Sequence, residues 1–318
     1  MIPFSMRALT TRTLSTGALA LAVSVPAAAA AVVAPEAVAA LHAQTRTDLD
    51  ASMRGEAYAY ATYSLFADQA RAKGLPSVRQ LFQRTAKVEL GEHFAEEAKL
   101  SGLAGSDAAN LQAALKGEEY ESHSMYPTFA RQARQDGDSA AANLFEEIAK
   151  DEAGHHAAFA KALEVVRTGK GTIPAPPGVQ PVTVREGAPK VRAARTKQNL
   201  DTALHGEAMA SAKYTQFAKA AAAHGNQALA RLFTGTADVE RREHFAGEAQ
   251  LAGVVGSARK NLTTAVNGEQ YESRIMYPTY ARQAKTAGDA KAAELFAHNA
   301  KDEAGHARAF DHARNQLH

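Results

Sequence analysis

Apolar side chains recur along the chain at steps of three and four residues, the spacing of one face of an α-helix. Over residues 45–166 this pattern falls into four segments, separated by breaks at residues 74–76, 101–106 and 136–138. Glycine, proline and aspartate at the breaks are typical of turns between helices. No stretch alternates apolar and polar residues for long enough to predict a sheet. The pattern therefore predicts an all-α fold.

Each predicted helix carries an apolar stripe that marks its inward face. The stripe residues are Leu49, Met53, Tyr60, Tyr63 and Ala67 on the first helix, Val78, Phe82, Thr85 and Ala95 on the second, Leu111, Ala114, Met125 and Thr128 on the third, and Ala141, Phe145, Ile148, Phe159 and Ala162 on the fourth. Four consecutive helices with such stripes predict a four-helix bundle.

The same unit occurs twice, because the chain matches itself without a gap when it is shifted by 151 residues. The matching stretches include Gly55-Glu56 with Gly206-Glu207, residues 118–128 with 269–279, and residues 150–155 with 301–306. Each repeat has the length of an ordinary domain. We expect one four-helix bundle over residues 45–166 and a second over residues 195–318.

Residues 167–194 separate the repeats and contain five prolines together with glycine and basic residues. Proline removes a backbone donor and breaks a helix, so this stretch predicts a semi-extended linker. Its Arg and Lys residues are interpreted as solvated charges rather than as a nucleic-acid-binding arm.

Carboxylates interrupt the stripes at mid-length on all four helices. In the first repeat they are Glu56 on the first helix, Glu89 and Glu92 on the second, Glu118 and Glu121 on the third, and Glu152 with His155 on the fourth. In the second repeat they are Glu207, Glu240, Glu243, Glu269, Glu272, Glu303 and His306. Side chains three residues apart share a helix face, so each set points into its bundle.

A buried cluster of unpaired carboxylates costs several kcal/mol for each group, so it needs cations or protons. Two divalent ions per bundle would neutralise four charges and satisfy the carboxylate oxygens. The alternative is that each Glu is exposed on an alanine-rich helix and paired with Lys or Arg. Glutamates combined with Glu-x-x-His motifs on facing helices are the di-iron arrangement of ferritin-like bundles, which favours the metal site.

On these residues the sequence resembles the rubrerythrin branch of the ferritin-like superfamily, over nearly all of residues 45–166 and 196–318. The most specific stretch, NL-x5-GE-x-YE-x3-MYP-x2-A, lies at residues 110–130 and 261–281. The resemblance implies two tandem ferritin-like bundles without a rubredoxin domain, each with two iron ions. The ligands it implies are Glu56, Glu89, Glu118, Glu121, Glu152 and His155, and Glu207, Glu240, Glu269, Glu272, Glu303 and His306.

The second helix departs from the family pattern, which is Glu-x-x-His with the histidine as a ligand linked to peroxide chemistry. Gap-free alignment places Glu92 and Glu243 at that position, and His93 and His244 follow one residue later. One residue turns a side chain by about 100° on an α-helix. We therefore expect Glu92 and Glu243 to be ligands, and His93 and His244 to support them or to lie on the surface. This departure argues against family-like peroxidase activity.

The donor set is rich in oxygen and suits iron, with manganese as an alternative and zinc as an adventitious occupant. Two ions about 3.5–4 Å apart can be bridged by one peroxide or O₂ molecule. Tyr63, Tyr120, Tyr214 and Tyr271 are candidates to position that substrate or supply a proton, with core packing as the alternative role.

Three readings of the function stay open at this point. The first is an oxidoreductase that reduces hydrogen peroxide or O₂ while Fe(II) is oxidised. The second is a metal-binding or iron-sequestering protein without turnover. The third is a structural helical bundle whose Glu clusters take up adventitious metal.

The amino-acid composition excludes several kinds of site and gives no support to one kind of partner. The 318 residues contain no cysteine, which excludes a disulfide, a thiolate nucleophile and a rubredoxin-type iron site, so any electron donor must be external. The formal net charge is +2, and beyond residue 31 basic and acidic residues balance at 34 each. That balance gives no electrostatic case for binding nucleic acid.

The N-terminus has the pattern of a secretory signal peptide. Arg7 and Arg12 precede an uncharged stretch with a short apolar run, and the small residues 27–31 follow. This order predicts a signal peptide over residues 1–31 and a secreted or extracytoplasmic protein. The alternative is an uncleaved membrane anchor, because about 20 apolar residues span a bilayer.

The connection between the second and third helices raises a question of topology. In a ferritin-like bundle these helices are parallel, so the connection would cover roughly 31 Å plus a lateral step of about 8–10 Å. About eight extended residues span at most ~29 Å. Either the helix ends fray, or helix hairpins are exchanged, within the chain or between the chains of a homodimer. Exchange would combine Glu56 and Glu89 with Glu269 and Glu303, and Glu207 and Glu240 with Glu118 and Glu152.

Overall fold

The computed structural model of the protein describes residues 41–317. The predicted signal peptide, residues 1–31, lies outside this range. Every regular element between residues 41 and 317 is helical, which confirms the predicted all-α class. Within the same range, no helix combines the length and the apolar character needed to cross a membrane.

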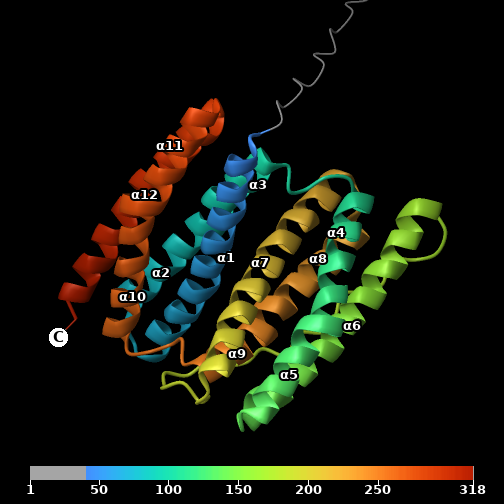
Figure 1. Ribbon diagram of the computed structural model, residues 1–318, viewed down its shortest axis with the longest axis horizontal. Helices are drawn as coiled ribbons and strands as arrows, with labels where there is room; N and C mark the ends of the chain where they lie inside the picture. Colours follow the sequence, from blue (N-terminus) through green and yellow to red (C-terminus); the bar gives the residue numbers. More distant parts are fainter. Residues whose placement is uncertain (1–40, 318) are drawn as a thin grey trace, which may run out of the picture. The chain divides into compact units, whose positions relative to one another are not determined.

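Each repeat forms four helical rods, and two of the four are interrupted by a short π-helical turn (Figure 1). In the first repeat the elements are α1 (Ala43–Ala72), α2 (Pro76–Val88), η1 (Glu89–His93), α3 (Phe94–Ser101), α4 (Asp107–Tyr120), η2 (Glu121–Met125), α5 (Tyr126–Gln135) and α6 (Ser139–Thr168). In the second they are α7 (Ala194–Ala223), α8 (Gln227–Val239), η3 (Glu240–His244), α9 (Phe245–Ala252), α10 (Ala258–Tyr271), η4 (Glu272–Met276), α11 (Tyr277–Ala287) and α12 (Ala290–Asn315).

The turn from α3 to α4 is short because both helix ends are capped locally. Gly102 ends α3 in the left-handed conformation with φ of 69°, which favours glycine. The hydroxyl of Ser106 then accepts a hydrogen bond from the backbone N–H of Ala109 and starts α4. Gly253 and Ser257 repeat this arrangement between α9 and α10.

These short turns carry the chain from one bundle into the other. Bundle I consists of α1, α2–α3, α10–α11 and α12, and bundle II consists of α4–α5, α6, α7 and α8–α9. In Figure 1 the blue α1 lies beside the orange α10, while the green α4 lies beside the yellow α7.

The structure therefore has the helix-hairpin exchange, formed within one chain. The ranges 45–166 and 195–318 delimit the sequence repeats, but neither repeat makes a self-contained bundle. The exchange follows from the length of these connections. The turns after α3 and α9 are too short to run back along their own bundle.

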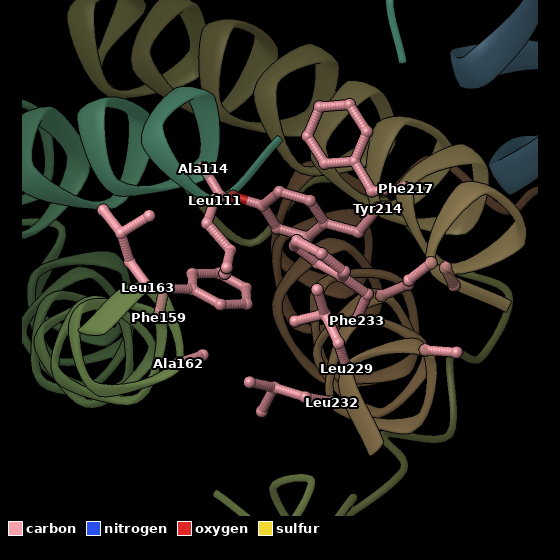
Figure 2. Close-up of a cluster of buried hydrophobic side chains, with 14 of the residues drawn as sticks. Leu111, Ala114, Phe159, Ala162, Leu163, Tyr214, Phe217, Leu229, Leu232 and Phe233 are labelled. Atoms are coloured by element: carbon pink, nitrogen blue, oxygen red, sulfur yellow. The ribbon is translucent and has the colours of Figure 1, made fainter. Parts of the chain in front are cut away.

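Each bundle has two apolar clusters, one on each side of a layer of carboxylates. In bundle II, Figure 2 shows Leu111 and Phe159 from α4 and α6 packed against Tyr214 and Phe233 from α7 and α8. At the other end of bundle II, Tyr126 and Phe145 pack with Leu200 and other apolar residues. Core residues from both sequence repeats thus enclose each carboxylate layer.

The bundles meet where α1 packs against α7. Ala57 and Ala61 on α1 lie in one buried cluster with Ala208 and Ala212 on α7. Small side chains let two helices approach closely along their length. This contact joins the two bundles into one compact unit over residues 41–317.

Candidate metal centres

Bundle I contains a layer of four carboxylates and two imidazoles, which we call centre I. Its members are Glu56 on α1, Glu89 and His93 in η1, Glu269 on α10, and Glu303 and His306 on α12. Five of these residues are buried, and His306 is partly buried. The first repeat supplies one half of centre I and the second repeat supplies the other half.

The two histidines of centre I mark two adjacent cation positions. His93 Nδ1 lies 2.8 Å from Glu303 Oε1, 3.0 Å from Glu89 Oε2 and 3.6 Å from Glu56 Oε2. His306 Nδ1 lies 2.8 Å from Glu303 Oε2, 3.3 Å from Glu89 Oε1 and 3.4 Å from Glu269 Oε2. Glu89 and Glu303 each turn one oxygen toward each position, so they are placed to bridge two cations.

Bundle II contains the matching layer, which we call centre II. Its members are Glu118, Glu152, His155, Glu207, Glu240 and His244. His155 Nδ1 lies 2.8 Å from Glu152 Oε2 and 3.2 Å from Glu240 Oε1. His244 Nδ1 lies 3.0 Å from Glu152 Oε1 and 2.9 Å from Glu240 Oε2, so these two carboxylates are the bridging pair of centre II.

The prediction that Glu92 and Glu243 are ligands, with His93 and His244 in a lesser role, is wrong. Glu92 is exposed and Glu243 is half-buried, whereas His93 and His244 are each 2% exposed. The cause is the π turn, in which Phe94 N–H donates to the Glu89 carbonyl five residues back. This wider turn takes in one extra residue, which returns the histidine to the face that carries Glu89. The Glu-x-x-x-His spacing in η1 thus replaces Glu-x-x-His.

Glu121 and Glu272 lie beside the centres but outside the tight ligand groups. Glu272 Oε1 would be 3.6 Å from a Cβ atom added at Gly55, and Glu121 Oε1 would be 3.9 Å from one added at Gly206. These are ordinary van der Waals distances, so they show that Glu272 lies against α1 and Glu121 against α7, beside Glu56 and Glu207. Burial, and then the charge of Glu303, raises the pKa of Glu272 to about 8. Their assignment as ligands stays a prediction.

The four predicted tyrosines divide into two pairs. Tyr63 is buried and donates a 2.6 Å hydrogen bond to Glu269 Oε1, and Tyr214 donates to Glu118 in the same way. Tyr120 and Tyr271 are 58% and 54% exposed and point away from the centres, so their predicted role is wrong. They sit immediately before the π turns, where the helix face changes.

Sequence reasoning missed a second pair of tyrosines. The Tyr277 hydroxyl donates to Glu56 and also lies 3.0 Å from Glu97 Oε1, within hydrogen-bond distance. Tyr126 makes the same contacts with Glu207 and Glu248 in bundle II. These tyrosines belong to the MYP motif, which the sequence marked as specific without a chemical role.

Two further carboxylates, Glu97 and Glu248, are also fully buried and were missed. Each lies four residues after its π-turn histidine, which is the signal that could have found it. In bundle I the amide of Asn299 donates a 3.1 Å hydrogen bond to Glu97, whereas Ile148 occupies that position in the other repeat. The two centres are therefore not identical in their surroundings.

Asp151 contacts the outer nitrogen of the π-turn histidine His244, and Asp302 lies near that of His93 without a hydrogen bond. His93 Nε2 lies 3.6 Å from Asp302 Oδ2, and His244 Nε2 lies 3.4 Å from Asp151 Oδ2. A carboxylate at the outer nitrogen fixes the tautomer that presents Nδ1 to a metal. These aspartates precede Glu303 and Glu152 in the KDEAGH stretches.

The carboxylates of each centre have strongly shifted pKa values. Burial, reinforced by the charge of Glu303, raises the pKa of Glu56 well above its ordinary range. Burial acts on Glu303 in the same direction, but hydrogen bonds from His306 and His93 hold its pKa below the usual value. Burial would lower the pKa of His93, but hydrogen bonds to Glu303 and its neighbours raise it. Without cations, part of each cluster must therefore stay protonated.

The residues of both centres fit a pair of divalent cations. Both oxygens of Glu89 and Oε2 of Glu269 are buried without a hydrogen-bond partner, and centre II leaves both oxygens of Glu240 and Oε2 of Glu207 in the same state. Buried polar atoms without partners are costly unless an ion satisfies them. Carboxylate oxygens with two imidazole nitrogens suit iron.

This fold and these centres define a ferritin-like di-iron carboxylate protein, with glutamates from two helices and a Glu–His pair from each of the other two. The rubrerythrin family matches residues 48–163 and, separately, residues 198–314. The chain belongs to the rubrerythrin family.

Individual relatives each align with a length of about one repeat. Nigerythrin from Nitratidesulfovibrio vulgaris is 36% identical over 141 residues, covering 40% of this chain and 70% of the relative. Rubrerythrin from Porphyromonas gingivalis is 34% identical, covering 40% of this chain and 69% of the relative. Symerythrin from Cyanophora paradoxa is 34% identical, covering 39% and 71%. No solved structure matches the chain significantly.

Proposed function

We propose that the protein reduces hydrogen peroxide, or O₂, at its two centres with electrons from an external donor. The observation that carries this proposal is the pair of adjacent His–carboxylate groups that share Glu89 and Glu303 in centre I, and Glu152 and Glu240 in centre II. When bound, two Fe(II) ions supply the two electrons that convert one peroxide and two protons into two water molecules.

The chain's own residues would orient the substrate and manage protons. Burial raises the pKa of Tyr63 and Tyr277 well above the ordinary value, and nearby glutamates raise it further. Both hydroxyls therefore keep their protons and donate to Glu269 and Glu56 on opposite sides of centre I. Groups that hold a proton at the edge of a dry site are placed for general acid catalysis.

The corrected position of His93 removes the sequence-based argument against peroxide chemistry. His93 and His244 stand where the family pattern has its peroxide-linked histidine. In bundle II, Asp151 at the outer nitrogen of His244 favours the orientation that presents Nδ1 to the cluster.

The test is to load the metal-free chain with Fe(II), count the bound iron, and follow peroxide and O₂ consumption with a chemical reductant. The proposal predicts about two iron ions per centre and multiple turnovers. Bound iron without consumption of either oxidant would identify a sequestering protein instead. No stoichiometric iron would contradict the metal centres. Parallel loading with manganese and zinc identifies the metal that supports turnover.

We further propose that the chain is exported through residues 1–31. Residues 1–31 lie outside the described part of the chain, so the support comes from their sequence. It is the order of basic residues, apolar run and small residues. N-terminal sequencing of the protein from cell fractions tests this. A mature protein that starts after about residue 31 outside the cytoplasm supports export, and an intact N-terminus in the membrane fraction identifies an anchor.

A further inference from the structure

The linker between the repeats is bonded along one face of bundle II. The backbone N–H of Gln180 donates to the carboxylate of Glu243, and that of Val182 donates at 2.8 Å to the carbonyl of Arg242. Further on, the N–H of Lys190 donates at 2.8 Å to the carbonyl of Leu251. We call residues 175–182 the strap, since they are fixed across α8 and η3.

The strap closes one side of a cavity of about 390 Å³ next to centre II. Pro177 and Gln180 of the strap line this cavity together with Asp151 and His155 from α6 and Glu243 from η3. His155 is a member of centre II, so the cavity adjoins that centre at His155.

The sequence of α8 is adapted to the strap at one position. A Cβ atom added at Gly235 would lie 2.4 Å from Pro176 Cβ, so only glycine lets the strap lie this close. The matching position in the first repeat is Arg84, which is exposed. Arginine there could not coexist with a strap in the same place.

Within residues 41–317, the side chains at the corresponding face of bundle I are more exposed. The side chain of His306 is 17% exposed, against 7% for its counterpart His155. Val88 is half-buried where Val239 is buried, and Glu92 is exposed where Glu243 is half-buried. In bundle II, the three residues compared, His155, Val239 and Glu243, all line the cavity that the strap closes.

We propose that the strap makes the two centres selective for different substrates. Centre II, reached through the cavity beside His155, admits small peroxides of the size of hydrogen peroxide and excludes bulky ones. Centre I also accepts bulky organic hydroperoxides. This proposal rests on the proposed function, because it requires iron at both centres.

The test is the release of Fe(II) from the loaded full-length chain to a bulky sulfonated chelator such as ferrozine. We expect two phases of similar amplitude, with the slow phase at least about tenfold slower, which corresponds to a barrier difference of ~1.4 kcal/mol. Glu303→Ala, which disables centre I, should leave the slow phase. Glu152→Ala, which disables centre II, should leave the fast phase.

Two pairs of matched variants separate the strap from general effects. Gly235→Arg should displace Pro176 and merge the slow phase with the fast phase, whereas Arg84→Gly should leave both phases unchanged. Glu243→Ala removes the acceptor for the Gln180 N–H and should also speed the slow phase, whereas Glu92→Ala should not. If Gly235→Arg fails to fold, the Glu243→Ala pair decides.

A single release phase from a chain with both centres loaded would overturn the strap proposal and leave the proposed function standing. Slow and fast phases that neither Gly235→Arg nor Glu243→Ala changes would also overturn it. A small chelator such as acetohydroxamate should empty both centres at similar rates, and a retained tenfold difference with it would contradict selection by size. Absence of stoichiometric iron would be a failure of the proposed function instead.

Discussion

His93 and His244 show how one residue of register decides which side chains reach a metal. On a regular α-helix, Glu92 would follow Glu89 on the inward face, and His93 would be turned away by about 100°. The π turn reverses this, so the buried residue is the histidine and the exposed residue is the glutamate.

We therefore expect His93→Ala to weaken metal binding at centre I and Glu92→Ala to leave it unchanged. Loss of a residue that only orients a ligand typically costs 10–100-fold, so loss of the ligand itself should cost at least ~100-fold in affinity. Titration of each metal-free variant with Fe(II) measures this. A larger loss of affinity in Glu92→Ala than in His93→Ala would indicate the α-helical register and contradict the π turn.

Substitution of Asp151 should cause a loss of metal affinity smaller than that expected for loss of a ligand. Its carboxylate orients His244 through Nε2 without facing the cations, so Asp151→Ala should weaken metal binding at centre II by about 10–100-fold. Centre I should keep its affinity. Glu147→Ala is the matched control, because Glu147 is an exposed acid one turn earlier on α6. Equal effects of the two substitutions would show that Asp151 acts only through its charge.

The sequence was sufficient to predict the carboxylates on uninterrupted helical segments and insufficient to predict the residues that follow a π turn. Glu56, Glu118 and Glu152 lie in or directly before regular helical segments whose period fixes their faces. Tyr126 follows a π turn, and one inserted residue turns the rest of the helix by about 100°. Tyr120 was chosen on the uninterrupted helical period and is exposed, while Tyr126 on the other side of the turn is buried against Glu207.

At the scale of elements, the four π turns share one position. Each begins at a glutamate in or beside a carboxylate layer, namely Glu89, Glu121, Glu240 or Glu272. π-Helical turns are rare, occur mostly as single turns inside α-helices, and are frequent at functional sites. Helix propensity does not predict these π turns, because the residues on both sides of each turn favour a regular α-helix.

The start of α7 depends on a single carboxylate in the turn between α5 and α6. Asp138 accepts hydrogen bonds from the backbone N–H groups of Arg192, at 2.9 Å, and Ala193, at 3.0 Å. Burial alone would raise the pKa of Asp138, but these two bonds hold it below the ordinary value. This contact attaches the C-terminal end of the linker to bundle II.

Asp138→Ala should destabilise the metal-free protein by about 1–3 kcal/mol, because two charge-assisted hydrogen bonds are lost. Since the pKa of Asp138 is lowered on folding, its contribution is fully present above about pH 5 and is lost as the pH falls through the folded-state pKa. Urea unfolding at neutral pH and at about pH 3 measures both effects. Asp138→Asn, which keeps one acceptor, should cost less, and an equal cost at both pH values would refute the assignment.

At the scale of the whole molecule, the exchange makes each repeat incomplete. From sequence, the short connection after α3 suggested this topology. Frayed helix ends would have explained the short connection equally well. The structure keeps α3 and α4 helical up to Ser101 and from Asp107, so the turn cannot lengthen and the chain crosses to the other bundle.

A fragment of residues 41–168 should therefore not form a metal centre as a monomer. Its α1–α3 and α4–α6 hairpins each lack partners, which a second copy can supply with nearly the same contacts. We expect a dimer by light scattering, with iron bound only in the dimeric fraction. A monomer that binds a full complement of about two iron ions would contradict the exchange as a requirement.

The central claim is that two di-iron centres are each assembled from both repeats, and the iron content of two double variants tests it most directly. Glu89→Ala with Glu303→Ala removes both bridging carboxylates of centre I and should leave about half of the wild-type iron. Glu89→Ala with Glu152→Ala removes one bridging carboxylate from each centre and should leave almost none. Self-contained repeats require the opposite order, so more iron in the second double variant than in the first would contradict the account.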